Sequence, residues 1–193
     1  MNTNQTEEAD EDVGAPKEWY SRGYLPHRDA KQLLQAVTFR LADSLPQEKL
    51  KLLEEELLEL PENQRSTHRR EKIEQWLDDG MGCCALRHPK LAEQMRDSLQ
   101  HFDGQRYRLI AWCIMPNHVH LLVGGMRRGE LRKQVTSWKR WSAGQINRLL
   151  GRSGRLWQEE NHDHLVRNAA AFQAIQNYIA QNPVKAGLKA GEY

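Results

Sequence analysis

Four short runs of hydrophobic residues, rich in β-branched and aromatic side chains, predict β-strands. They cover residues 35–41, 106–116, 117–123 and 162–167. Pro116 separates the second run from the third, so these two strands are expected to form an antiparallel pair.

Five longer segments carry apolar residues at helical spacing and predict α-helices. They cover residues 46–60, 66–80, 89–102, 129–150 and 168–183. We expect Ser66 or Thr67 to cap the second helix, Asn168 to cap the last one, and Pro183 to stop it. The first two helices read as a helical hairpin, inserted at about residues 43–80 into a fold formed by the rest.

Without this insert, the order is strand, helix, strand, strand, helix, strand and a further helix. This order is typical of an α+β, ferredoxin-like βαββαβ core. It predicts a four-stranded antiparallel sheet with two helices on one face, followed by a C-terminal helix. Residues 16–193 are expected to form this single domain, and residues 1–15 a disordered acidic tail.

The composition argues against a membrane or secreted protein. No apolar run reaches the roughly 20 residues that a spanning helix needs, and the N-terminus lacks the regions of a signal peptide. The chain has three cysteines, two of them adjacent, and this is not the pattern of a disulfide framework. A cytoplasmic location, where thiols stay reduced, fits best.

The charge is strongly segregated along the chain. Residues 1–12 hold five acids and no base, whereas residues 126–155 hold nine Lys or Arg and one acid. A solvated helix face is the ordinary explanation of a charge run, but such a face usually mixes signs. The basic segment therefore suggests a polyanionic partner.

The run "MPNHVHLLV" at residues 115–123 places two histidines one residue apart. In a strand, His118 and His120 point to the same face, about 6–7 Å apart, while Val119 and Leu121 point into a core. Buried imidazoles of this kind serve a metal ion, a phosphate or ordinary hydrogen bonds. The sequence "HDHL" at 162–165 has the same spacing, so spacing alone does not select the first pair.

The last predicted helix carries Tyr178 and Asn182, four residues apart and therefore on one helix face. Its apolar residues, including Ile175 and Ile179, suit docking on a sheet. The spacing leaves two interpretations open: a polar pair that serves a site, or a half-buried core tyrosine and a helix-ending asparagine.

Taken together, the motifs resemble a known family. "WCIMPNHVHLLV", the Lys/Arg-rich helix with "SWKRW", "HDHLVRN" and "YIAQNPVKAGL" are similar to the single-tyrosine HUH transposases, and most of all to the REP-associated tyrosine transposases. The resemblance covers roughly residues 19–188, apart from the insert.

The resemblance implies a metal-dependent DNA transesterification. His118 and His120 match the pair that holds one divalent cation, Mg²⁺ or Mn²⁺, and Asn182 matches a third ligand that is typically Gln in the related insertion-sequence transposases. Tyr178 matches the nucleophile, which attacks a DNA phosphate and gives a 5′-phosphotyrosine and a free 3′-OH. The expected substrate is single-stranded DNA with a hairpin formed by a repetitive extragenic palindrome.

The basic helix is expected to contact this DNA. The residues assigned to phosphates are Arg127, Arg128, Arg132, Lys133, Lys139, Arg140 and Arg148. Trp138 and Trp141 share a helix face, and we expect Trp141 to pack on the sheet and Trp138 to be available to DNA bases. The segment 19–29 either reads the single-stranded flank or covers a sheet edge.

Two alternative functions are also compatible with the sequence. A domesticated hairpin-binding protein would keep the fold and the DNA affinity with little or no cleavage. A metal-dependent phosphodiesterase would use water and leave no covalent adduct. A monomer is favoured over a homodimer.

Overall fold

The computed structural model describes residues 33–127 and 129–188. The predicted acidic tail at 1–15, the segment 19–29 and Arg128 lie outside the described residues.

Four antiparallel strands form one sheet in the order β2-β3-β1-β4. Their bounds are β1 Leu33–Arg40, β2 Arg108–Ile114, β3 His118–Met126 and β4 His162–Leu165. Helix α3 (Pro89–Gln100) connects β1 to β2, and α4 (Glu130–Leu149) connects β3 to β4. The predicted ferredoxin-like fold is therefore confirmed.

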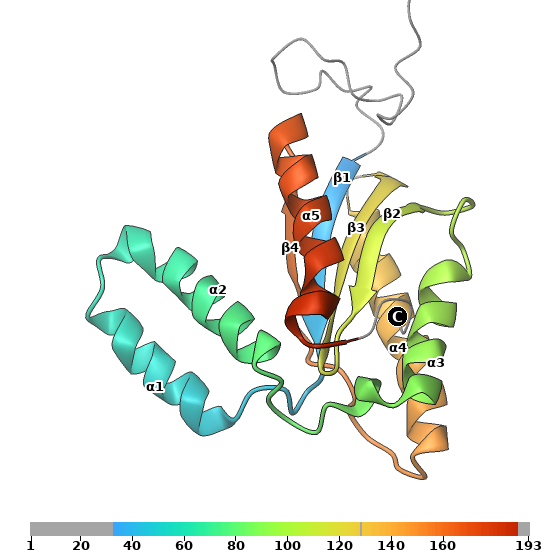
Figure 1. The fold of residues 1–193 in the computed structure, drawn as a ribbon, viewed down its shortest axis with the longest axis horizontal. Helices are drawn as coiled ribbons and strands as arrows, with labels where there is room; N and C mark the ends of the chain where they lie inside the picture. The colour runs from blue at the N-terminus through green and yellow to red at the C-terminus, as the bar shows by residue number, and fades with distance from the viewer. Residues whose placement is uncertain (1–32, 128, 189–193) are drawn as a thin grey trace, which may run out of the picture.

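The helices cover the sheet from both sides (Figure 1). Helices α3 and α4 pack on one face, where the side chains of Val119, Leu121 and Val123 enter the larger core. Helix α5 (Ala169–Lys185) packs on the other face, where Leu122 meets Ile179 in a smaller core. Strand β3 is therefore buried on both faces, and its alternation decides which side chains face α5.

The inserted hairpin consists of α1 (Gln47–Leu58) and α2 (Glu62–Asp78), and it projects from the body of the molecule (Figure 1). A short 3-10 helix, η1 (Ala85–Arg87), follows it. The predicted start of the second helix at Ser66 or Thr67 is wrong, because α2 begins one turn earlier, directly after Pro61. Proline sets a backbone angle that suits the entry to a helix, so no hydroxyl cap is needed there.

Helix α5 begins as predicted, since the Asn168 side chain accepts a hydrogen bond from the backbone N–H of Ala171. It does not stop at Pro183, which lies inside its last turn. The carbonyls of Asn182 and Pro183 still accept hydrogen bonds from Ala186 and Leu188. A proline this close to a helix end removes little, because few turns remain to be disrupted.

The roles predicted for the two tryptophans of α4 are reversed. Trp138 is 1% exposed and donates its indole N–H to the Tyr107 hydroxyl, whereas Trp141 is 44% exposed. The buried stripe of α4 runs through Val135, Trp138 and Ser142, so Trp141 falls at its margin.

Candidate functional site

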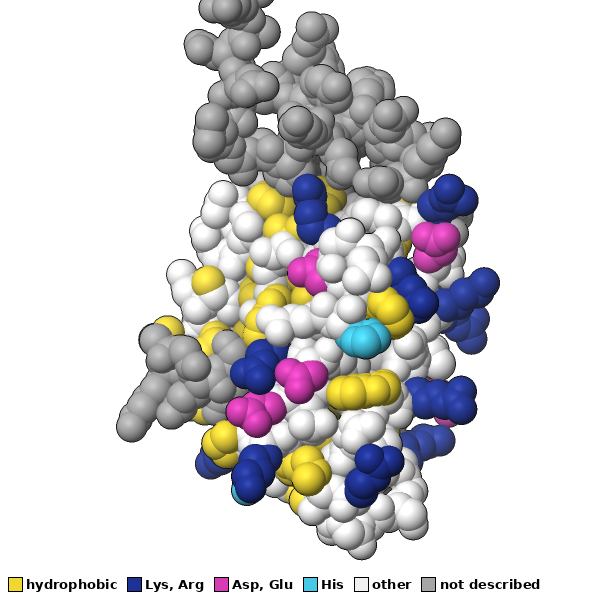
Figure 2. Space-filling model, turned by 90° about the vertical axis from the view of Figure 1, so that its right-hand side faces the viewer, with side chains coloured by type: hydrophobic (Ala, Val, Ile, Leu, Met, Phe, Trp, Pro, Cys, Tyr) yellow, Lys and Arg dark blue, Asp and Glu magenta, His cyan; other side chains and the backbone are white. Residues whose placement is uncertain are grey.

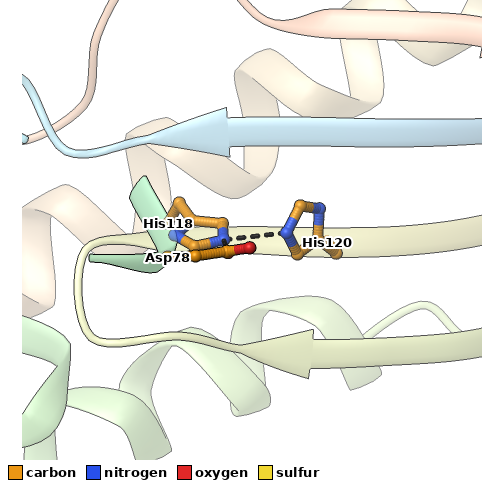
Figure 3. A group of neighbouring side chains, drawn as sticks. All are labelled: Asp78, His118 and His120. Atoms are coloured by element: carbon orange, nitrogen blue, oxygen red, sulfur yellow. Dashed lines mark hydrogen bonds and ion pairs between the residues drawn. The ribbon is translucent and has the colours of Figure 1, made fainter. Parts of the chain in front are cut away.

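His118 and His120 point from β3 toward α5 and converge on one another (Figure 3). Their Nε2 atoms lie 2.8 Å apart, and the side chains are 0% and 3% exposed. Burial lowers the pKa of His120 to about 4 and holds the pKa of His118 well below its usual range. Both imidazoles are therefore neutral at physiological pH, so each ring carries one N–H and one lone pair.

The outer ring nitrogens of both histidines are held by neighbouring side chains. His118 Nδ1 lies 2.7 Å from Asn117 Oδ1, and His120 Nδ1 lies 2.8 Å from Thr38 Oγ1. Asn117 donates its amide N–H to the Met81 carbonyl, so its oxygen is left to accept from His118. This leaves the Nε2 lone pair of His118 facing His120, the arrangement found around metal-binding histidines.

Asp78, the last residue of α2, brings a carboxylate to the same point (Figure 3). Its Oδ1 lies 3.8 Å from His118 Nε2, and the ligand atoms of Asp78, His118 and His120 all lie within 4.8 Å of one another. The Asp78 side chain is 36% exposed. Asp78 was not predicted from the sequence, because it lies in the insert and belongs to no motif.

Helix α5 places Tyr178 against this group. The rings of Tyr178 and His120 meet edge to face, with centroids 5.2 Å apart. Burial raises the pKa of Tyr178 to about 12, and the neighbouring Asn182 amide acts in the opposite direction. Tyr178 is therefore a protonated phenol at neutral pH unless the site changes its surroundings.

Asn182, one turn further along α5, is 1% exposed. Neither its amide oxygen nor its amide nitrogen makes a hydrogen bond of good geometry within the described residues. The amide is nevertheless close enough to the Tyr178 hydroxyl and the Cys113 thiol to act against the burial that raises the pKa of both groups. The structure thus brings together His118, His120 and Tyr178, and it places Asn182 beside Tyr178.

A cavity of about 230 Å³ opens beside this group. Its lining includes Tyr178, His120, His164, Arg70 and Glu74. The second histidine pair, His162 and His164, is exposed on the edge strand β4, and its ring centroids lie 5.6 Å apart. This pair borders the cavity without belonging to the converging His and Asp group.

The predicted DNA-contacting residues lie mostly on α4, across the sheet from Tyr178. Lys and Arg side chains gather along one edge of the side that carries α3 and α4 (Figure 2). Those exposed at α4 and just before it are Arg127, Arg132, Lys133, Arg140 and Arg148. Lys133, Arg140 and Trp141 line a shallow hollow there, so Trp141 rather than Trp138 is the aromatic side chain available to a ligand.

Lys139 does not share this exposed surface. Its Nζ donates to the backbone carbonyls of Gln158, Glu159 and Glu160 at 3.0–3.2 Å, and burial lowers its pKa to about 8. The ammonium group of Lys139 thus holds the segment before β4 in this structure, and its predicted phosphate contact stays a prediction.

In the described parts of the chain, no helix combines the length and the apolar character needed to cross a membrane.

The matches to known proteins described below are all transposases. Residues 85–182 match the family model described as "Transposase IS200 like". A curated protein of Haemophilus influenzae (strain Rd), a candidate REP-associated tyrosine transposase by name, is 28% identical over 102 residues. That match covers 48% of this chain and 56% of the relative, so the chain spans only about half of that protein's length.

Two solved structures are similar at low identity. A REP-associated tyrosine transposase bound to a REP hairpin is 17% identical, with a TM-score of 0.49 over 89% of this chain and 75% of the other. A candidate transposase of Deinococcus radiodurans is 18% identical, with a TM-score of 0.34 over 85% of this chain and 97% of the other.

Proposed function

Because the chain belongs to the IS200-like transposase family, as its motifs predicted, we propose that it cuts and rejoins single strands of DNA through a phosphotyrosine intermediate. The observation that carries this proposal is the meeting of Tyr178 with the converging imidazoles of His118 and His120. A phenol beside a metal-binding group is the arrangement that nucleophilic attack on a phosphate needs.

The residues fit a divalent cation, Mn²⁺ or Mg²⁺. His118 and His120 would offer Nε2 atoms, and Asp78 and Asn182 are the candidates to supply oxygen ligands. Imidazole suits transition metals, whereas carboxylate and amide oxygens suit Mg²⁺ and Mn²⁺, so the mixed set favours Mn²⁺. When bound, the cation polarises the phosphate and stabilises the charge that develops on the oxygens around phosphorus.

The chemistry of Tyr178 is an exchange of one phosphate ester for another. The phenolic oxygen forms a bond to phosphorus, the bond from phosphorus to the 3′ oxygen breaks, and the phenol proton is balanced by the proton that the 3′ oxygen gains. Attack by the free 3′-OH on the phosphotyrosine reverses this step, and attack by another 3′-OH joins a new end. No nucleotide hydrolysis is required, because the number of phosphodiester bonds is conserved.

DNA binding is proposed to involve the outer face of α4, where Lys133, Arg140 and Trp141 combine positive charge with an exposed aromatic ring. This combination is typical of surfaces that hold a phosphate backbone and stack on unpaired bases. The name of the Haemophilus relative and the motif resemblance support a palindromic DNA hairpin as the substrate.

We propose that the chain acts as a monomer, because the histidines and Tyr178 of one chain already meet in one site. A cytoplasmic location is consistent with three free cysteines.

The proposal is tested by incubating the protein with hairpin-bearing single-stranded DNA and Mn²⁺ or Mg²⁺, then separating the products on a denaturing gel. We expect a protein band shifted by covalently attached DNA, absent in Tyr178→Phe and in His118→Ala. DNA cleavage without a shifted band would instead indicate water as the nucleophile. Tight binding without cleavage would indicate a DNA-binding protein that has lost the chemistry.

A further inference from the structure

The outer face of α4 and the Tyr178 site lie on opposite faces of the sheet (Figure 1). DNA held by α4 alone cannot present a phosphate to Tyr178. We propose that the inserted helix α2 and the sheet edge form a groove that binds the single-stranded DNA next to the cleaved phosphate. This proposal rests on the proposed function and deepens it.

The groove consists of two cavities that share part of their lining. The Tyr178 cavity of about 230 Å³ is followed by a second cavity of about 460 Å³. Thr38, Arg70, Glu74 and His162 line both. The second cavity therefore adjoins the space in front of Tyr178, and together the two are of a size that receives an extended ligand.

Strand β1 forms the floor where the two cavities meet. Thr38 is paired with His120 across the sheet, and Arg40 is paired with His118. Residues two apart in a strand share a face, so Arg40 lies on the same face as Thr38 and the two histidines. Arg40 is thus the β1 residue paired with His118, and its side chain lines the second cavity.

Helix α2 forms the wall, with Arg69 and Arg70 lining the second cavity. Arg40 donates one hydrogen bond to Ser44 Oγ at 3.0 Å, and Arg69 pairs with Glu54 at 2.9 Å on an exposed surface.

The groove also contains two acidic residues, Glu74 and Glu160. Burial raises the pKa of Glu74. Arginine offers several donors in a plane that matches phosphate, so three arginines in this groove favour a polyanion despite the two acids.

The apolar part of the lining comes from the same hairpin: Leu50 of α1 with Ile73 and Leu77 of α2. Ser66, Gln158 and Asn161 add uncharged polar groups. Grooves that combine cationic side chains with apolar surface bind the backbone and the bases of single strands together. A double helix is a poor candidate, since its bases are paired and stacked away from such a wall. Single-stranded DNA is therefore the ligand that this groove fits best.

The test compares two DNAs, a stem–loop with single-stranded extensions on both ends and the same stem–loop without them. Fluorescence anisotropy gives each Kd in EDTA over a range of salt concentrations. The groove variant combines Arg69→Ala with Arg70→Ala. The matched control combines Lys51→Ala with Lys72→Ala, which removes the same charge from the same hairpin but from outside the groove.

Each lost contact to a single strand lowers the salt slope by roughly 0.7, so the groove variant should bind the extended DNA about 25-fold more weakly near 0.1 M salt. Its affinity for the bare stem–loop should equal that of the wild type, which also shows that the variant is folded. The control variant should match the wild type on both DNAs. Arg40→Lys, which keeps the charge and loses the planar fork, should weaken binding of the extended DNA only.

Equal affinity of the groove variant and the wild type for the extended DNA would overturn the proposal, as would equal weakening by the control variant. These outcomes are distinct from failure of the proposed function. If the wild type forms the phosphotyrosine adduct while the groove variant binds normally, only the groove is wrong. If the wild type binds the stem–loop but forms no adduct, the chemistry is wrong whatever the groove does.

Discussion

Replacing Asp78 by asparagine is expected to weaken Mn²⁺ binding while leaving the fold intact. The substitution removes one negative charge and keeps the shape of the side chain. Because Asp78 Oδ1 lies 3.8 Å from His118 Nε2, a cation held by that nitrogen would lie within reach of the carboxylate.

The size of the effect follows from Coulomb's law. Opposite unit charges about 4 Å apart attract by about 1 kcal/mol in water, and therefore by about 2 kcal/mol when one ion is divalent. The water value is appropriate as a lower bound, since the Asp78 side chain is 36% exposed. This free energy corresponds to a Kd for Mn²⁺ that is roughly 30-fold higher in Asp78→Asn.

The assay is titration of the metal-free protein with Mn²⁺, with free Mn²⁺ measured by its electron paramagnetic resonance signal. Asp79→Asn is the matched control, because it makes the same charge change one residue along the chain but lies outside the cluster. Unchanged Mn²⁺ affinity in Asp78→Asn would refute the assignment of Asp78 as a ligand. Equal losses in both variants would show only the effect of net charge. Asn182→Ala, measured alongside, tests the other oxygen ligand.

Three further outcomes are expected. Trp138→Ala should lower the free energy of unfolding by about 3–5 kcal/mol, as measured by urea unfolding. Trp141→Ala should leave the free energy of unfolding unchanged and weaken DNA binding by about 1–3 kcal/mol. Equal stability of the two variants would contradict the burial of Trp138. In EDTA, stability should fall as the pH drops from 6.5 toward 4, because the folded pKa values of His118 and His120 are depressed and the unfolded chain binds these protons first. His120, with a folded pKa of about 4, accounts for roughly 3 kcal/mol of this loss. The fall should therefore be shallower in His120→Gln. Iodoacetamide at pH 8 should label the exposed Cys83 and spare Cys113, because burial raises the pKa of the Cys113 thiol to about 12. Peptide mass spectrometry measures the labelling of each cysteine. Rapid labelling of Cys113 in the native protein would mean that the site opens.

Local periodicity was enough to predict most of the fold and part of the candidate site. Alternation along a strand places His118 and His120 on one face, and helical spacing places Tyr178 and Asn182 together. Their meeting was expected from the motif resemblance, because no spacing rule connects a strand with a helix that starts about 50 residues later.

Asp78 could not be predicted in this way, because its position depends on how the insert returns to the body of the molecule. That return is fixed by the hydrogen bond from Asn117 to the Met81 carbonyl, a contact between residues 36 positions apart. Nothing in the local sequence of either residue indicates it.

The reversal of the two tryptophans has a local cause. The buried stripe of α4 continues through Ser142, which looks like a surface residue in the sequence. The Ser142 hydroxyl donates to the Trp138 carbonyl and accepts from the Trp157 indole N–H, so it is buried without an unmet hydrogen bond. A buried polar residue whose hydrogen bonds are made within the protein interrupts the hydrophobicity pattern. The pattern then no longer indicates which face of the helix is buried.

If the proposed function holds, the separation of the α4 surface from the Tyr178 site by the sheet sets a minimum length for a DNA strand that contacts both. A strand that touches both surfaces must pass around an edge of the sheet, since it cannot pass through. A helix layer is about 10 Å thick and the sheet adds several more, so the path is at least about 15 Å. At the rise of about 3.4 Å per nucleotide of a stacked strand, this is roughly four or five nucleotides, and fewer where the strand is extended. The thickness of the protein would then act as a ruler that sets the distance between the foot of the hairpin and the cut.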